Sequence, residues 1–327
     1  MVRWGIIATG SIANKFAKTV SLMGEEAKVI ACASRSVERA KEFADQYGIE
    51  KYYGSYEELV QEEEVDAVYI STPNNYHFEN MKMCIEAGKA VLCEKPFTTN
   101  AEEAKEIFAL AREKGVFVME AFWVKMMPLN LKLQELLKEN VIGQVKHVRA
   151  EFGFVPDEKR RERKLDSSLA GGALLDIGIY NLGFAGLVFG LEPKNILSSV
   201  SKNEFGTDEY ETLVLEYGNG KTASLTSAIG MAMPTEGVIY GTEGKIYFPN
   251  YQLAEKLRIE RYDGTSEEIA IPFEINGFEY QIREVAKGIK ENQVESNLHP
   301  HKDTLAMMDL MDRIRSSWDM VFTCENK

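Results

Sequence analysis

The sequence predicts an α/β protein, with an amino-terminal Rossmann domain built on a doubly wound parallel sheet and a carboxyl-terminal α+β domain with a large, mostly antiparallel open sheet. In the first 122 residues, short apolar runs alternate with amphipathic stretches of helical length, as in β-α units. From His147 onward, polar and apolar residues alternate in successive runs, as in strands with one buried face. A chain of 327 residues has room for two domains, which we predict at residues 1–122 and 123–327.

The charge balance excludes one class of partner. The formal net charge is −13, and basic residues do not gather into a stripe. We therefore expect neither a nucleic acid nor a membrane as partner, since both require a positive surface. The single basic cluster, residues 159–164 (KRRERK), fits a solvated loop or helix face, and binding of an anionic substrate is the alternative.

Cysteine and histidine usage indicates neither disulfides nor a metal. The four cysteines form no CxxC pair, and the four histidines show no ligand spacing apart from the weak pair His299 and His301. The first residues enter a strand without a signal peptide, and no apolar run reaches the ~18 residues of a membrane helix. These observations predict a cytoplasmic protein with reduced thiols and no metal site.

The first β-α unit has the pattern of a dinucleotide site. An apolar strand from Trp4 to Ala8 leads through Gly10, Ser11, Ile12 and Ala13 into a helix. A glycine turn of this kind lets amide groups at a helix start face a pyrophosphate, and the helix dipole favours the negative charge. Set against G-x-G-x-x-[GA], the sequence has Ala8 in place of the first glycine, which leaves a weak match on its own.

The second strand, Ala27 to Ser34, indicates which dinucleotide is bound. NAD-binding proteins usually place an acidic residue after this strand, whereas here Ser34, Arg35 and Ser36 follow one another. A cation and hydroxyl groups suit a 2′-phosphate, so we predict NADP(H) in preference to NAD(H). The alternative is that Arg35 is a surface residue beside a helix cap at Ser36.

Two later strands end in polar residues. Ala67 to Ser71 runs into Thr72, Pro73 and Asn74, and Ala90 to Cys93 stops at Glu94, Lys95 and Pro96. The carboxyl ends of parallel strands form the edge at which open α/β sheets bind ligands, which makes Lys95 a candidate functional residue. An ordinary loop lysine is the alternative.

The second half predicts an open sheet. A strand around Val148 to Phe154 is followed by seven further candidates, one pair of which is joined at Gly218-Asn219-Gly220 as a hairpin. We expect helices, including Glu279 to Glu291 and Asp303 to Trp318, to cover one face of this sheet. The other face is then an apolar surface that needs a partner, so we predict a homodimer through this sheet.

One stretch of this half, Ala170 to Asn181, is unusual. If it is helical, Asp176 and Tyr180 are four residues apart and share a face, while Gly171 and Gly172 admit something bulky, such as a flat cofactor ring. A phenol and a carboxylate near an amine form a possible proton relay. A helix with a buried tyrosine bonded to aspartate is the alternative.

Four motifs together resemble the glucose–fructose oxidoreductase, inositol dehydrogenase and MocA (Gfo/Idh/MocA) family over essentially the whole chain. They are Gly5–Ala13, Ser71–Asn74, Glu94–Pro96 and the Gly171–Tyr180 helix. Within the family, Tyr180, where many members carry histidine, and the stretches Met119–Trp123 and Leu174–Tyr180 are most similar to the dimeric dihydrodiol dehydrogenases, a group also described as NADP-dependent xylose dehydrogenases.

The resemblance implies a bound nicotinamide nucleotide, a dimer and an assignment of roles. Lys95 is implied near the substrate oxygen, with a cis peptide bond to Pro96, and Tyr180 takes the acid/base position with Asp176 beside it. A free tyrosine titrates near 10, and a lysine cation close by lowers that pKa toward neutrality. The implied dinucleotide site consists of Gly10, Ser11, Ile12, Ala13, Ser34, Arg35, Thr72, Pro73, Asn74, His77, Glu94, Lys95 and Pro96.

The leading functional hypothesis is an NAD(P)-dependent oxidoreductase that moves a hydride between the nicotinamide and a secondary alcohol or carbonyl of a small sugar, polyol or cyclic diol. Trp123 and Phe154 are candidate walls of the substrate pocket, with plain core packing as the alternative. A non-catalytic nucleotide-binding regulator with the same fold is the second hypothesis. A sugar-binding module without a cofactor is the third, and it conflicts with the Gly10 turn and Arg35.

Overall fold

The computed structural model describes residues 1–325 and divides into two compact units. The first unit comprises residues 1–123 and 274–305, and the second comprises residues 124–273 with the chain from residue 306 onward. Among the described residues, no helix combines the length and the apolar character needed to cross a bilayer.

The first unit contains a six-stranded sheet in the order β3-β2-β1-β4-β5-β6, and all of its pairings are parallel. The doubly wound Rossmann architecture predicted from the sequence is therefore confirmed. Its strands are short, and apart from the edge strand β3 their apolar side chains are buried, as central parallel strands require. They are β1 (Val2–Ile7), β2 (Ala27–Ala33), β3 (Lys51–Tyr53), β4 (Ala67–Ile70), β5 (Ala90–Cys93) and β6 (Val118–Glu120).

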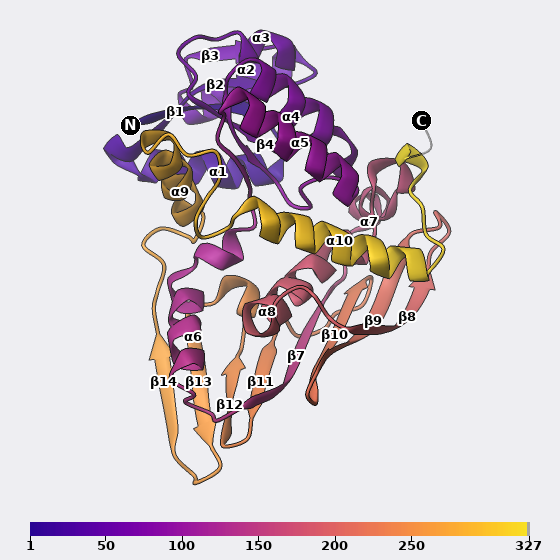
Figure 1. Cartoon of the computed structure of the whole chain (residues 1–327). Coiled ribbons are helices and arrows are strands. Elements are labelled where there is room, and N and C mark those ends of the chain that lie inside the picture. Colours follow the sequence, from indigo (N-terminus) through magenta and orange to yellow (C-terminus); the bar gives the residue numbers. More distant parts are fainter. Residues whose placement is uncertain (326–327) are drawn as a thin grey trace. The chain divides into compact units, whose positions relative to one another are not determined.

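The helices of this unit begin and end where local chemistry demands. Ser36, Ser55 and Asn100 accept backbone N–H groups at three helix starts, and Gly48 and Gly115 end two helices with φ of 67° and 65°. Helices α4 and α5 lie side by side (Figure 1). The helices are α1 (Ser11–Leu22), α2 (Val37–Tyr47), α3 (Tyr56–Val60), α4 (His77–Glu86), α5 (Ala101–Lys114) and α9 (Glu279–Lys290).

Helix α9 corrects one expectation. It packs within the first unit, where it contacts β5, rather than covering the second sheet. Its start is fixed by Glu279, which accepts the N–H groups of Ile275, Asn276 and Gly277. Periodicity showed that a helix forms here, but it could not show which sheet the helix covers.

The second unit contains an eight-stranded sheet in the order β14-β13-β12-β11-β7-β10-β9-β8. Only the β7–β10 pairing is parallel, so the prediction of a mostly antiparallel sheet is confirmed. Asn219 and Gly220 turn the β9–β10 hairpin with φ of 54° and 70°. The strands are β7 (Val145–Phe154), β8 (Asn195–Lys202), β9 (Asp208–Gly218), β10 (Lys221–Ile229), β11 (Gly237–Gly241), β12 (Gly244–Phe248), β13 (Lys256–Arg261) and β14 (Ser266–Ala270).

Helices cover one face of this sheet, where α8 packs on β7 and β10, and α6 packs on α8 (Figure 1). The expectation that the opposite face is apolar is wrong. Along β7 that face carries Arg149 and Glu151, and Arg149 forms an ion pair with Glu236 at 2.8 Å. The helices of this unit are α6 (Pro128–Lys138), α7 (Glu158–Leu165), α8 (Ile179–Phe189) and the later part of α10 (His301–Ser317).

Candidate functional site

The amino end of α1 is open. Gly10 precedes the helix in an extended conformation (φ −80°), no side chain caps it, and the first turn holds no acidic residue. A Cβ built on Gly10 meets no atom within 4 Å. The free amide groups therefore face open space with a favourable dipole, which fits the pyrophosphate of a dinucleotide. Behind the turn, Ala13 is fully buried.

Ala8 adopts a glycine-like conformation just before this turn. Its φ is +70°, in the left-handed region that side chains rarely occupy. The N–H of Ala8 donates to the carbonyl oxygen of Ala33, and the hydroxyl of Ser71 donates to the carbonyl oxygen of Ala8. The bonds on both sides hold the chain in the shape that a glycine would adopt freely, so the turn is retained although the first glycine is missing.

Replacing Ala8 with glycine should therefore stabilise the protein, by about 0.5 to 1 kcal/mol, because relief of the left-handed strain exceeds the added chain entropy of glycine. Chemical denaturation measures the change. The matched control is Gly48→Ala, at a position with φ of 67° and no neighbour within 4 Å of a Cβ, which should lower stability by a similar amount. A lower midpoint for Ala8→Gly would contradict the assignment of strain.

The end of β2 presents Arg35 at the surface. Ser34 is buried, and its N–H donates to the carbonyl oxygen of Tyr53, while Ser36 caps α2. Arg35 is exposed and forms no ion pair within residues 1–325. A guanidinium without a carboxylate partner remains available to a phosphate.

The loop after β4 is braced by His77. Its Nδ1 lies 2.9 Å from the carbonyl oxygen of Pro96, and its Nε2 lies 3.0 Å from that of Thr72. The ring is fully buried, and burial lowers its pKa. His77 thus ties the loops after β4 and β5 together and is enclosed by protein. Pro73 and Asn74 lead from this loop into a single helical turn that begins at Asn74.

The loop after β5 carries Glu94, Lys95 and Pro96, with the Lys95–Pro96 peptide bond in the cis form that the resemblance implied. The hydroxyl of Tyr69, on β4, donates to the Glu94 carboxyl. Burial raises the pKa of Glu94, while the Tyr69 hydrogen bond and the charge of Lys95 oppose that rise. The strand end thus places a hydrogen-bonded carboxyl next to the candidate lysine.

A second lysine lies close to Glu94, and sequence reasoning missed it. Lys15, on α1, stands over the rings of Trp123 (4.6 Å) and Phe278 (4.2 Å), and its charge acts on Glu94. Burial lowers the pKa of Lys15. Trp123 is 5% exposed and packs against Phe278 and this cation. Only the position of Lys15 on the helix that follows the glycine turn could have drawn attention to it.

In the second unit, Asp176 lies in a π-helical turn, Leu174–Gly178, which we call the π-turn. Backbone hydrogen bonds in a π-helix span five residues rather than four. The expectation that Asp176 and Tyr180 share a face because they are four residues apart on an α-helix therefore does not apply unchanged. Asp176 forms an ion pair with Lys164 at 2.5 Å. Lys164 ends the basic cluster, which forms helix α7, so one residue of this cluster has a half-buried ion-pair partner rather than only solvent.

Aromatic rings surround this pair. The Lys164 Nζ lies 5.3 Å from the Phe154 ring centre, and Phe152 lies 6.2 Å from both Phe154 and Tyr180. Tyr180 is 6% exposed. Two phenylalanine rings, Phe152 and Phe154, thus lie between Tyr180 and the ion pair of Lys164 with Asp176.

Other parts of the protein fill the space beside the two glycines that precede the π-turn. A Cβ on Gly171 would lie 2.4 Å from the carbonyl oxygen of Lys164, and one on Gly172 would lie 2.2 Å from Asp208. The expectation that these two glycines admit a cofactor ring is therefore wrong. Glycine is needed at both positions because a loop and a strand pack tightly against this segment. Residue spacing alone cannot reveal such packing.

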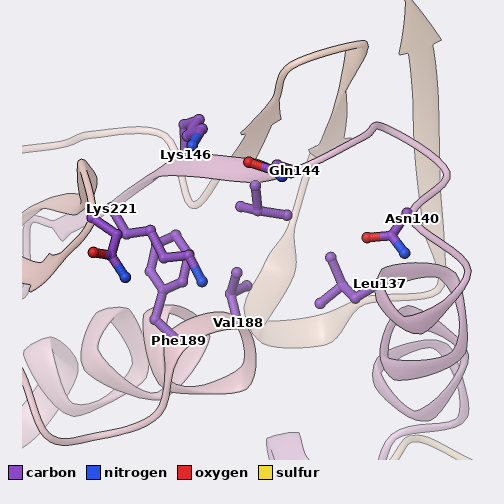
Figure 2. A pocket seen from close by; sticks show the side chains of 9 residues that line it. Leu137, Asn140, Gln144, Lys146, Val188, Phe189 and Lys221 are labelled. Carbon is purple, nitrogen blue, oxygen red and sulfur yellow. The ribbon is translucent and has the colours of Figure 1, made fainter.

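A surface cavity of 460 Å³ in the second unit is lined by side chains that include Leu137, Val188 and Phe189 (Figure 2). Lys221 stands over the ring of Phe189 there, 5.8 Å from its centre. No predicted site residue lines the cavity, so we do not assign it to the site. Within residues 1–325, no group of three or more His, Cys, Asp or Glu residues is arranged to hold a metal.

Comparison with known proteins identifies the family. Residues 2–122 match the oxidoreductase family with an NAD-binding Rossmann fold, and residues 130–247 match the GFO/IDH/MocA C-terminal domain. The chain is 35% identical over 331 residues to trans-1,2-dihydrobenzene-1,2-diol dehydrogenase of Mus musculus, covering 98% of each chain. It is 34% identical to the enzyme of the same name from Danio rerio, covering 100% of this chain and 99% of that one.

Solved structures agree. KijD10, a 3-ketoreductase from Actinomadura kijaniata solved with NADP and TDP-benzene, is 29% identical with a TM-score of 0.86, over 96% of this chain and 97% of that one. Aldose-aldose oxidoreductase from Caulobacter crescentus is 23% identical with a TM-score of 0.87 over 97% of each chain, a likeness of fold. The chain belongs to the GFO/IDH/MocA family of NAD(P)-binding oxidoreductases and is a dehydrogenase or reductase.

Proposed function

We infer that the protein is an NADP(H)-dependent oxidoreductase that acts on a secondary alcohol, or the corresponding carbonyl, of a small sugar, polyol or cyclic diol. One observation carries this proposal. The open amino end of α1 and the Glu94-Lys95 loop both follow strands of the same parallel sheet, β1 and β5, at the carboxyl edge where such sheets bind nucleotides.

We assign proton transfer to Lys95 and Tyr180. A lysine ammonium donates hydrogen bonds to a substrate oxygen, and a phenol takes up or gives the proton as the oxygen changes between hydroxyl and carbonyl. We assign to Asp176, which forms an ion pair with Lys164, the role of orienting Tyr180. The bound nicotinamide supplies the hydride chemistry. Solved forms of the related ketoreductase include a lysine-to-alanine variant and a tyrosine-to-phenylalanine variant, which favours attention to these residue types.

The substrate class rests on the relatives and on the aromatic surroundings of Tyr180. The curated relatives are named for a cyclic diol, and the related 3-ketoreductase was solved with TDP-benzene. Phe154, half-buried beside Lys164, suits the apolar face of a ring whose hydroxyl groups meet charged side chains. We therefore propose Phe154 as a wall of the substrate pocket. Trp123 is the corresponding candidate from the first unit.

The preference for NADP(H) is proposed on Arg35. Replacing Arg35 with alanine should weaken NADPH binding about tenfold or more, because a charge-assisted bond to the 2′-phosphate is lost, and should leave NADH binding nearly unchanged. Titration of both nucleotides into the full chain, followed by their fluorescence, measures this.

The matched control is Gly10→Ala. The backbone at Gly10 accepts an alanine without a clash, so the fold should persist, but the methyl group would enter the space assigned to the pyrophosphate. This variant should weaken NADPH and NADH alike. Equal affinity of the parent protein for both nucleotides, or an Arg35→Ala variant with undiminished NADPH affinity, would overturn the NADP(H) assignment.

We also propose a homodimer formed through the exposed face of the eight-stranded sheet. The side chains on this face are half-buried Thr, Ser, Tyr and charged groups rather than an apolar patch, so such a contact would be polar. Sedimentation equilibrium should give twice the chain mass of 36.9 kDa, and a single-chain mass at micromolar concentration would contradict the proposal. Three of the four cysteines are buried free thiols, which fits the reducing cytoplasm proposed as its location.

A further inference from the structure

Two acidic side chains, Asp208 and Glu211, are fully buried on β9. Residues three apart on a regular strand face opposite sides of the sheet. Here the ladder with β8 is irregular and leaves Glu209 as an extra residue. A bulge of this kind shifts the alternation of side chains, so that Asp208 and Glu211 face the same side.

Both carboxyl groups lie against the π-turn. The N–H of Leu174, the first residue of the turn, donates to Oδ2 of Asp208 at 2.6 Å. A Cβ on Gly178, the last residue of the turn, would lie 2.8 Å from Oε1 of Glu211. The carboxyl of Asp208 therefore accepts a hydrogen bond from the start of the π-turn, and the carboxyl of Glu211 packs against its end.

Both carboxyl oxygen atoms of Glu211 and Oδ1 of Asp208 are buried and have no hydrogen-bond donor within residues 1–325. The neighbouring hydroxyl of Ser227, on β10, accepts from Nδ2 of Asn181 at 2.9 Å. Asp208 and Glu211 lie close enough for the charge of Asp208 to act on Glu211. A bond between two carboxyl groups forms only when one of them carries a proton.

The surrounding charges do not allow both groups to ionise. Neither Asp208 nor Glu211 forms an ion pair with a lysine or arginine of the described chain. The cation that acts on Asp208 is Arg315 of α10, and its guanidinium is paired with Asp312 and Glu325. The charged groups of the π-turn itself are also balanced, since Asp176 is paired with Lys164.

Burial raises the pKa of both groups. It raises the pKa of Asp208 to about 7, and that of Glu211 well above its usual range because the charge of Asp208 adds to the effect of burial. Both shifts favour a pair that holds a proton, while Oδ2 of Asp208 accepts from the N–H of Leu174.

We propose that Asp208 and Glu211 share one proton and act as positioning residues that hold the π-turn, and with it Asp176 and the start of the helix that carries Tyr180. The role in positioning rests on the proposed function, because it needs Tyr180 to take part in the reaction. The shared proton does not depend on that function.

The first test is infrared spectroscopy of the full chain. The parent protein at neutral pH should show the carbonyl stretch of a buried protonated carboxyl, and Glu211→Gln should lack it. A spectrum unchanged by Glu211→Gln would overturn the shared proton. Because this measurement needs no turnover, its failure is distinguishable from failure of the proposed function.

The second test compares Glu211→Gln with Glu211→Leu. Glutamine keeps a donor toward Asp208, whereas leucine removes it, so kcat should be about tenfold lower in the leucine variant than in the glutamine variant, with little change in the KM for NADPH. Amide exchange across residues 170–180 should be faster in the leucine variant. Equal kcat and equal exchange in the two variants would overturn the positioning role.

If the Glu211→Leu variant does not fold, a third measurement, on the parent protein, tests the positioning role. Protonation of Asp208 weakens the hydrogen bond from Leu174, because a neutral carboxyl is a poorer acceptor than a carboxylate. Amide exchange across residues 170–180, corrected for its intrinsic pH dependence, should therefore rise as the pH falls from 8 to 6. In Asp208→Asn this rise should vanish. Corrected exchange that is independent of pH in the parent protein would contradict the proposal.

Discussion

Replacing Lys95 with alanine is expected to lower kcat by roughly 10²-fold or more while NADPH binding stays nearly intact. The ammonium group at the end of β5 is proposed to hold the substrate oxygen and the charge that develops on it. The nucleotide site proposed at Gly10 and Arg35 does not use the Lys95 side chain for its pyrophosphate or ribose. Loss of the amine therefore affects the chemical step more than cofactor affinity, and steady-state kinetics with a parallel NADPH titration separates the two.

Lys105→Ala is the control for this change. Lys105 lies on the exposed side of α5 in the same unit, and its ion pair is with Glu102. An exposed pair of this kind contributes little to stability, so this variant should behave like the parent protein. Near-full activity of Lys95→Ala would refute its catalytic role, whatever the control shows.

Replacing Tyr180 with phenylalanine is the second change with a large expected effect, a fall in kcat of roughly 10²-fold. The substitution keeps the ring that packs 6.2 Å from Phe152 and removes only the hydroxyl. Stability should change little, and the pH dependence of kcat should lose the limb that belongs to the phenol. A pH series of initial rates measures both the fall and the change of profile.

Tyr217 provides a matched tyrosine in the same unit. Its buried hydroxyl has no hydrogen-bond partner among residues 1–325, and its ring packs against Phe189 at 5.0 Å. Tyr217→Phe therefore removes a hydroxyl without removing an interaction, and kcat should stay at the parent value. If Tyr180→Phe is as active as Tyr217→Phe, the acid/base group must be sought elsewhere, with Lys164 and Asp176 as the neighbouring candidates.

Local sequence patterns were sufficient to predict the fold class. The alternation of strands and helices before residue 122 defines the parallel sheet, and the two-residue periodicity after His147 defines the second one. These patterns report which face of an element is buried, and burial is what decides strand and helix in both units.

Long-range partners could not be predicted in the same way. Lys15, Lys164 and Asp208 became visible only when the fold brought them to Glu94, Asp176 and Leu174. A lysine in a charged run gives no sign of its partner, and a buried aspartate at a strand start resembles a turn residue. The π-turn was also hidden, since its sequence is compatible with an α-helix.

Ala8 shows a different limit. An alanine stands at a glycine position there, which left the pyrophosphate turn in question. The structure retains the turn, with the backbone held by Ala33 and Ser71. Local propensity was outweighed by hydrogen bonds from neighbouring strands, which a residue-by-residue comparison with a motif does not include.

The most direct test of the central claim is optical: oxidation of NADPH and of NADH by the full chain against ketoses, aldoses, inosose-like ketones and dicarbonyls, with the reverse reaction on xylose and cyclic diols. We expect turnover of at least one carbonyl compound of the panel, and faster turnover with NADPH than with NADH. NADPH that binds tightly yet is not oxidised with any member of the panel would contradict an oxidoreductase of this substrate class and favour a nucleotide-binding regulator.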